Sequence, residues 1–259
     1  MRVALVALGT SAVAASLALA RPALAAPPWV DRPITLPQGE WAFDVGMGVA
    51  HDPDDSSVGI NGEVAYGITS RIELGIRTGL RLSDADGRPL EPDNYGRLFD
   101  RQYFDGDGSV LANPELRIRG ALLRGQVELG LEGRLIIPLE TNYAGLEPGM
   151  PLAVHIGESV RLDTGVWMPI IVGANAPVGL SFPVDLWIQV SPRLWLGPMT
   201  GVFVSRVGDP GSQASVSMGF GLGYQITRTL DFKSMFLFPD INVEARDFGL
   251  GAGVQIRIE

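Results

Sequence analysis

The chain has 259 residues with 33 glycines, 19 prolines and no cysteine, and it carries 29 acidic against 20 basic residues. The acidic balance argues against nucleic acid as a partner, because binding a phosphate backbone requires clustered lysine and arginine. The lack of cysteine excludes a disulfide framework and a cysteine-linked lipid anchor, and the length suits one large domain.

The first 25 residues predict a cleaved secretory signal peptide. Arg2 precedes an apolar run over residues 3–20, and residues 23–25 read Ala-Leu-Ala, a small-residue cleavage pattern. A retained membrane helix is the alternative, because the run approaches the length that spans a bilayer. We expect residues 1–25 to be removed, and a cut after Ala20 is a second option. Residues 26–39 are rich in proline and predict an extended lead-in rather than a domain.

The rest of the chain, residues 40–259, repeats one pattern, in which large apolar side chains occupy every second position. Residues 71–82 carry Ile72 and Leu74 on one face and Glu73 on the other. A period of two predicts β-strands. We expect strands over residues 40–51, 58–66, 71–82, 115–122, 126–137, 152–162, 166–172, 182–190, 194–204, 214–226, 230–238 and 248–258.

The positions between the apolar residues predict a membrane barrel. In residues 214–226 these positions are mostly glycine and serine, which would give a second layer of a soluble core nothing large to enclose. After residue 25 no apolar run is long enough for a spanning helix. Long connections follow the odd strands and short turns follow the even ones, as in outer-membrane barrels. We therefore predict an all-β fold, a transmembrane antiparallel up-and-down β-barrel of about 12 strands. A soluble secreted all-β fold is the alternative.

A few positions depart from this pattern. Pro169, Pro183 and Pro198 each remove a ladder donor, so we expect strand ends or bulges there. Glu158 falls on the outward face of its predicted strand, which indicates a bulge or a shifted register. Elsewhere the outward residues should face lipid, among them Leu74, Val127, Leu222 and Val254.

The inward residues of the second to sixth predicted strands are strongly ionic. Two interpretations are open: a charged constriction through which a solute is drawn, or ion pairs between strands that fill a narrow barrel. The charged residues that we expect to line the lumen are Glu63, Glu73, Arg77, Arg81, Arg117, Arg119, Glu128, Glu132, Arg134 and Arg161.

One wall of the lumen is predicted to be aromatic. Trp167, Trp187 and Trp195 fall on the inward faces of the seventh to ninth strands. They would form either a greasy path for an apolar solute or the packing that holds an internal plug. A register change of one residue would turn all three toward lipid.

The sequence predicts no metal, no cofactor and no enzymatic activity. Residues 84–87 and 105–108 resemble fragments of calcium loops, but neither is followed by the closing glutamate at the right distance. His51 has Ser56 and Ser57 nearby, yet no G-x-S-x-G motif or positioned third partner accompanies them. We expect ordinary acidic loops and no catalytic set.

Three short segments resemble a known family. Residues 113–119 (Asn-Pro-Glu-Leu-Arg-Ile-Arg), the strand that follows over residues 127–138 and residues 151–154 (Pro-Leu-Ala-Val) are similar to the repeated hairpins of a bacterial outer-membrane family linked to phenol-degradation pathways. Members of that family are regarded as solute transporters, so the resemblance implies a barrel that carries a small solute. The chain departs from many outer-membrane barrels by ending in Glu259 rather than in an aromatic residue.

These features favour a passive channel or facilitator for a small, apolar or aromatic solute in the outer membrane of a Gram-negative cell. The polar inner face and the acidic loops support transport. The alternative is a structural or adhesive barrel with a blocked lumen, whose long segment 83–109 is the working surface. The expected partners are membrane lipid, the outer-membrane assembly machinery and the solute.

Overall fold

The computed structural model describes residues 27–51, 56–82, 111–139, 144–173, 178–241 and 248–259, so the expected signal peptide lies outside the described residues. Among the described residues no helix is long and apolar enough to cross a membrane. The regular elements are η1 (Trp29–Asp31), β1 (Trp41–His51), β2 (Ser56–Thr69), β3 (Ile72–Arg81), β4 (Glu115–Leu123), β5 (Val127–Ile136), β6 (Ala144–Ile156), β7 (Val160–Trp167), β8 (Ile170–Val172), β9 (Leu180–Gln189), β10 (Leu194–Ser205), β11 (Gln213–Gln225), β12 (Leu230–Phe238) and β13 (Phe248–Ile258).

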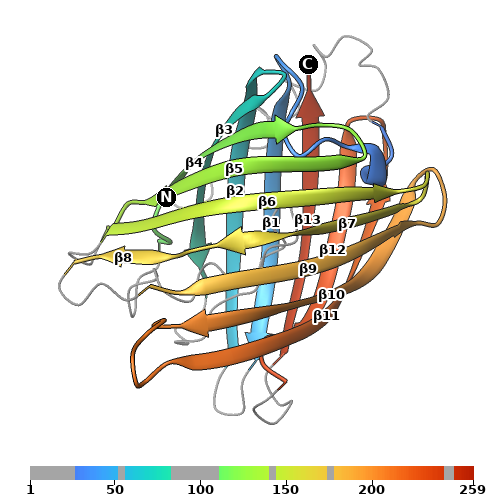
Figure 1. The fold of residues 1–259 in the computed structure, drawn as a ribbon. Coiled ribbons are helices and arrows are strands. Elements are labelled where there is room, and N and C mark those ends of the chain that lie inside the picture. The colour runs from blue at the N-terminus through green and yellow to red at the C-terminus, as the bar shows by residue number, and fades with distance from the viewer. Residues whose placement is uncertain (1–26, 52–55, 83–110, 140–143, 174–177, 242–247) are drawn as a thin grey trace, which may run out of the picture.

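The strands form one closed antiparallel ring (Figure 1). Most neighbours in sequence pair with each other, β7 pairs with β9, β13 pairs with β1, and β5 pairs with β6, which closes the circle. Strands β7 and β8 pair with successive parts of β6, so together they occupy one interrupted position in the ring. The protein is therefore a β-barrel with twelve strand positions and one additional strand segment, as its alternating sequence predicts.

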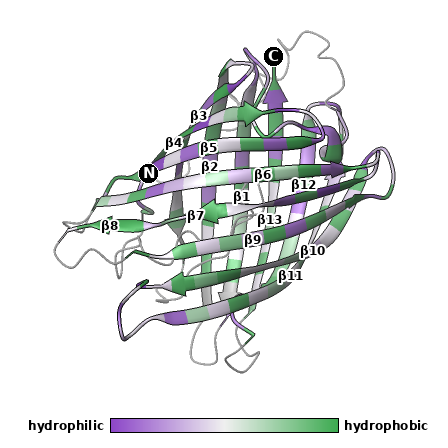
Figure 2. Cartoon of the chain, viewed as in Figure 1, coloured by the Kyte–Doolittle hydropathy of each residue, from purple (hydrophilic) through white to green (hydrophobic). Residues whose placement is uncertain are grey.

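Most strands separate an apolar outer face from a small or polar inner face, whereas β10 carries the large apolar side chains of Trp195, Met199 and Phe203 inside. In β11, Met218 and Phe220 are 54% and 45% exposed on the outside, whereas Gly221 and Gly223 are buried on the inside. Figure 2 shows the same alternation of hydrophobic and hydrophilic residues along the strands of the ring. An exposed apolar outer face belongs against lipid, and a polar inner face belongs around a lumen.

The expected boundaries are wrong in one region, between residues 138 and 172. The expected strands leave residues 138–151 and 163–165 as connections, but residues 144–151 lie in β6 and residues 163–165 lie in β7. Instead β6 runs to Ile156, and residues 157–159 make the turn into β7. Gly157 supplies the left-handed backbone conformation of this turn, with a φ of 65°. Glu158 therefore lies in a turn rather than in a strand, which explains why it did not fit the outward face.

The prolines weaken ladders without ending the ring. Met168 and Pro169 separate β7 from β8. Pro183 lies in a gap of the β7–β9 ladder between the pairs Thr164–Val184 and Trp167–Ser181. Pro198 lies in a similar gap of the β9–β10 ladder. A proline has no N–H to give, so these gaps lie where a donor is missing.

The depth of an outward residue should decide the cost of placing a charge there. We predict that Val254→Arg, near the middle of β13, lowers the free energy of unfolding by about 2–4 kcal/mol. Val127→Arg should cost about 0–1 kcal/mol, because Val127 is the first residue of β5 and lies near the membrane surface. Denaturant unfolding in lipid vesicles measures both. Equal costs would contradict the placement of Val254 in the apolar layer.

Candidate functional site

The interior of the ring carries a wall of charged side chains. Nine of the ten expected charged residues are buried on the inner faces of β2 to β5 and β7. The side chain of the tenth, Arg81, lies outside the described part of the structure. The nine are Glu63, Glu73, Arg77, Arg117, Arg119, Glu128, Glu132, Arg134 and Arg161.

Ion pairs between strands hold these charges in fixed positions. Arg117 of β4 pairs with Glu63 of β2 and, at 2.7 Å, with Glu73 of β3. Glu132 of β5 accepts from Arg119 of β4 and, at 3.0 Å, from Arg134. Such buried pairs add little net stability, because desolvation offsets most of their attraction. Their effect is to give the wall a defined arrangement of donors and acceptors.

The three expected tryptophans also lie inside, at 2–6% exposure. Each indole lies against an inward glycine of another strand: Trp167 on Gly149, Trp187 on Gly221 and Trp195 on Gly223. A Cβ atom at any of these glycines would overlap the ring. The glycines of the inner face therefore make room for large side chains that come from other strands.

The proline-rich lead-in enters the barrel, which the sequence did not predict. Residues 29, 30, 32 and 34–36 are buried, and Figure 1 shows this blue segment inside the ring near the end where the C-terminus lies. Trp29 stacks on Trp195, with ring centroids 5.1 Å apart, and meets Trp187 edge-on at 6.2 Å. The aromatic wall is thus where the lead-in packs. The apolar residues among the prolines, Trp29, Val30, Ile34 and Leu36, were the signal of burial in this segment.

Charged side chains of the wall hydrogen-bond the main chain of the lead-in. The strand ladders already use the backbone groups of the ring, so an inner segment must find side-chain partners for its own. The Ile34 N–H donates to Glu128 and the Leu36 N–H donates to Glu73, each at 2.7 Å. Arg119 donates to the Ile34 carbonyl at 3.1 Å.

Two further side chains hydrogen-bond the main chain of the lead-in nearer to η1. Arg161 donates to the Arg32 carbonyl. A ring nitrogen of His155 lies 2.6 Å from the Val30 carbonyl, so it must carry a proton to donate there. The lead-in therefore follows the charged wall from β6 and β7 across to β3.

The side chain of Arg32 reaches the opposite wall. It binds Asp231 of β12 through two nitrogens, one of them at 3.1 Å, and its guanidinium lies 5.3 Å from the Trp29 ring centre and 5.7 Å from that of Trp195. Burial, and secondarily Arg257, lowers the pKa of the Arg32 guanidinium, while Asp231 opposes that shift. The lead-in thus connects both sides of the lumen.

The lead-in leaves the lumen over one glycine of β2. The Gly39 N–H donates to the Gly67 carbonyl at 2.8 Å, and the Gly67 N–H donates to the Glu40 carbonyl at 2.9 Å. A Cβ atom at Gly67 would overlap the carbonyl of Pro37. Burial raises the pKa of the Glu40 carboxyl, although Arg257, 3.2 Å away, opposes this shift.

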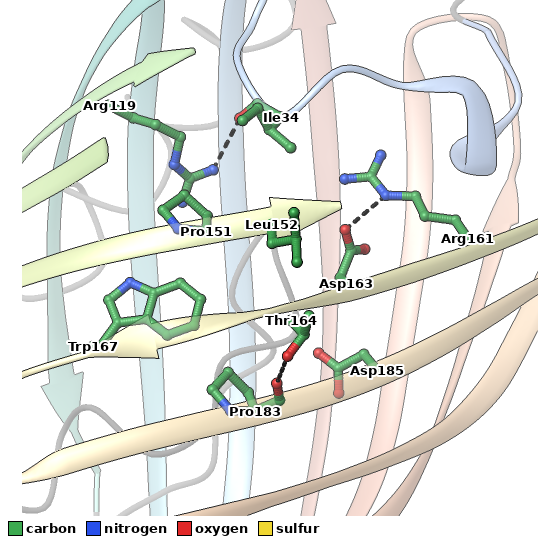
Figure 3. A pocket seen from close by; sticks show the side chains of 10 residues that line it. All are labelled: Ile34, Arg119, Pro151, Leu152, Arg161, Asp163, Thr164, Trp167, Pro183 and Asp185. Carbon is green, nitrogen blue, oxygen red and sulfur yellow. Dashed lines mark hydrogen bonds and ion pairs between the residues drawn. The ribbon is translucent and has the colours of Figure 1, made fainter. Parts of the chain in front are cut away.

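Two small cavities lie beside the lead-in among the described residues. A cavity of about 20 Å³ lies beside Ile34, between Arg119, the Arg161–Asp163 ion pair and Trp167 (Figure 3). Another of about 10 Å³ lies on the other side, beside Trp29 and Leu36. Each has room for about one water molecule. The lead-in therefore packs closely against the wall at these two places.

The described residues hold no group of three or more His, Cys, Asp or Glu side chains that could bind a metal ion. The two acidic segments at residues 84–87 and 105–108 lie outside the described residues. His51 lies opposite Ser56 in the β1–β2 ladder, and its ring packs on Phe248 with centroids 5.1 Å apart.

Comparison with known proteins identifies the fold and no family. No protein-family model matches the chain, and no curated protein matches it. The structure is similar to an outer-membrane channel from Pseudomonas putida F1, with a TM-score of 0.63 and 13% identity over 86% of this chain and 97% of that one. NanC porin gives a TM-score of 0.60 at 8% identity over 83% and 98%. KdgM porin, solved with disordered oligogalacturonate, gives 0.57 at 8% over 83% and 98%. The chain therefore has the barrel fold of outer-membrane porins, and the phenol-degradation family remains a resemblance.

The Arg32–Asp231 pair should control how firmly the lead-in is held. We predict that Asp231→Asn releases it, because an uncompensated buried charge costs about 3–5 kcal/mol. The natural chain has no cysteine, so Thr35→Cys, at a position with 0% exposure, reports release through maleimide labelling. We expect labelling to become at least about tenfold faster with Asp231→Asn.

The matched control adds Arg32→Gln to Asp231→Asn, which removes both charges. Protection of the cysteine should then largely return, because a neutral pair leaves no charge buried alone. If Asp231→Asn leaves the labelling rate unchanged, the pair does not hold the lead-in.

Proposed function

We propose that the protein is a passive outer-membrane channel for small solutes, closed at one end by its own residues 27–39. The observation that carries this proposal is a closed ring with an apolar outer face and a charged, buried inner face. The lead-in contacts the β2–β3 and β4–β5 turns through Ser70 and Arg124. Short turns of such barrels face the periplasm, so the closed end is the periplasmic one. No chemical step is assigned to the protein.

The charged wall favours a channel over a structural barrel. Apolar side chains of similar volume would fill a narrow barrel at no greater cost, because buried ion pairs are offset by their desolvation. A row of ordered arginines and glutamates is useful where a polar solute or an ion must pass. The lead-in inside the lumen supports the alternative, a structural or adhesive barrel, because no solute path is open while the lead-in stays in place.

The tryptophans support a closed state rather than a greasy solute path. Trp187 and Trp195 contact Trp29 of the lead-in, and Trp167 donates to Glu132 at 3.3 Å. Of the two interpretations of the aromatic wall, this geometry favours the packing of an internal plug. The route of a solute then follows the charged wall, and opening requires the lead-in to move.

A substitution that displaces the lead-in should open the channel. We predict that Gly67→Leu raises single-channel conductance in planar bilayers, because the new side chain needs the space of the Pro37 and Leu36 carbonyls. The ladder-bonded strand β2 has less freedom to move than the lead-in. Gly120→Leu is the control, because a Cβ atom there comes no nearer than 4.0 Å to another atom. If the natural chain and Gly67→Leu both fail to conduct, the structural alternative holds.

The charged wall should set the ion selectivity. We predict that replacing Arg77, Arg117 and Arg119 together by alanine shifts the reversal potential of the open channel toward cation selectivity, because the remaining inward glutamates then dominate the lumen. The control replaces Arg71, Arg193 and Arg228, which are exposed and near the turns. It removes the same charge outside the lumen. An equal shift in both variants would contradict a solute path along the charged wall.

A further inference from the structure

Five side chains contact main-chain atoms of the lead-in, and together we call them the row: Glu73, Arg119, Glu128, His155 and Arg161. These contacts go to backbone groups and so do not depend on the side chains of the lead-in. Four of the five contacts go to backbone groups of Arg32, Ile34 and Leu36, which alternate along the chain, and the fifth goes to the carbonyl of Val30 in the 3-10 helix η1. Alternate residues of an extended chain present their N–H and C=O groups on the same edge. The row therefore hydrogen-bonds one edge of an extended main chain, much as a neighbouring strand would.

Three side chains of this row are held in place by ion pairs that do not involve the lead-in. Glu73 pairs with Arg117 at 2.7 Å, and Arg119 pairs with Glu132. In the same way Arg161 pairs with Asp163 at 2.7 Å, and His155 lies 3.8 Å from Glu128. Because Glu73, Arg119 and Arg161 each keep an ion-pair partner on the wall, these three side chains stay ordered when the lead-in leaves. A preorganised site loses less free energy on binding a new ligand.

The space beside the row suits alternating side chains of moderate size. Ile34 packs against Ala121 and Ala153, and Leu36 packs against Ala42 and Ala65. These inward alanines leave room for an aliphatic side chain at every second position of a bound chain. Asp231 binds the side chain of Arg32, which lies two positions before Ile34, so a basic side chain fits there.

We propose that this row is a binding site for short extended peptides, and that the lead-in occupies it as a built-in competitor. The site accepts a peptide with a basic residue followed at every second position by aliphatic residues. This inference rests on the proposed channel function, since it names the solute class of that channel as oligopeptides. The chemistry recognised is the amide backbone, so the order of the intervening residues is free.

Competition in the full chain tests the site. In the Thr35→Cys variant, a peptide that takes the row displaces the lead-in and exposes the cysteine to maleimide. The probes are acetyl-Arg-Pro-Ile-Thr-Leu-Pro-amide, acetyl-Lys-Ala-Val-Ala-Val-Ala-amide, and the first peptide with N-methyl groups on its isoleucine and leucine amides. Millimolar concentrations are needed, because a tethered competitor has an effective concentration on the order of millimolar.

We expect the first two peptides to accelerate labelling to a saturating rate. The N-methylated peptide should need at least about a tenfold higher concentration for the same acceleration, because it lacks the two N–H donors for Glu128 and Glu73. Equal potency of the methylated peptide, or acceleration by the first peptide alone, overturns the inference. Conductance of Gly67→Leu tests the channel separately. If Gly67→Leu conducts but no peptide changes the labelling rate, the channel function stands and the peptide site is ruled out. If peptides accelerate labelling but Gly67→Leu does not conduct, the peptide site stands and the channel function is ruled out.

Discussion

The structure depends on one constraint, that every backbone N–H and C=O inside a bilayer must find a partner within the protein. Strands satisfy it only when the ladder has no free edge. The pairs β13–β1 and β5–β6 close this one. Closure then fixes the register of each strand, and the register decides which side chains face lipid and which face the lumen. The gaps at Pro183 and Pro198 are tolerated because the ring continues on either side of them.

The two halves of the interior are filled in different ways. A ring with twelve strand positions is narrow, so long inward side chains of nearby strands meet. From β2 to β7 they meet as ion pairs, and from β9 to β11 as indoles lying on glycines such as Gly221 and Gly223. Glycine in these strands gives up β propensity, and in return a tryptophan from another strand gains contact area. The inner face is therefore well packed although many of its residues, such as these glycines, are small.

The lead-in combines both halves of the interior. Its main chain lies on the ionic wall, where Glu73, Glu128 and Arg119 supply the partners that the ladders cannot. Trp29 packs on the aromatic wall. A buried, unpaired amide would cost about 1–3 kcal/mol, so the charged row is what allows an extended segment to lie inside the barrel. The ionic wall thus supplies hydrogen-bond partners for the main chain of the lead-in, while ion pairs within the wall hold its own side chains.

The sequence by itself determined the class of fold, the strand faces and most strand limits. It did so because the period of two is a local consequence of strand geometry, and residues 230–238 and 248–258 are strands β12 and β13 as expected. It failed between residues 138 and 172, where Pro148 and Pro151 lie within β6 and the turn rests on Gly157. It placed the charged and aromatic residues on the inner face, but it gave the lead-in no role. Only the tertiary structure could do that, because Ile34 meets Glu128 across 94 positions and Arg32 meets Asp231 across 199. Contacts between residues so far apart leave no periodicity in the sequence, since ring closure alone brings them together.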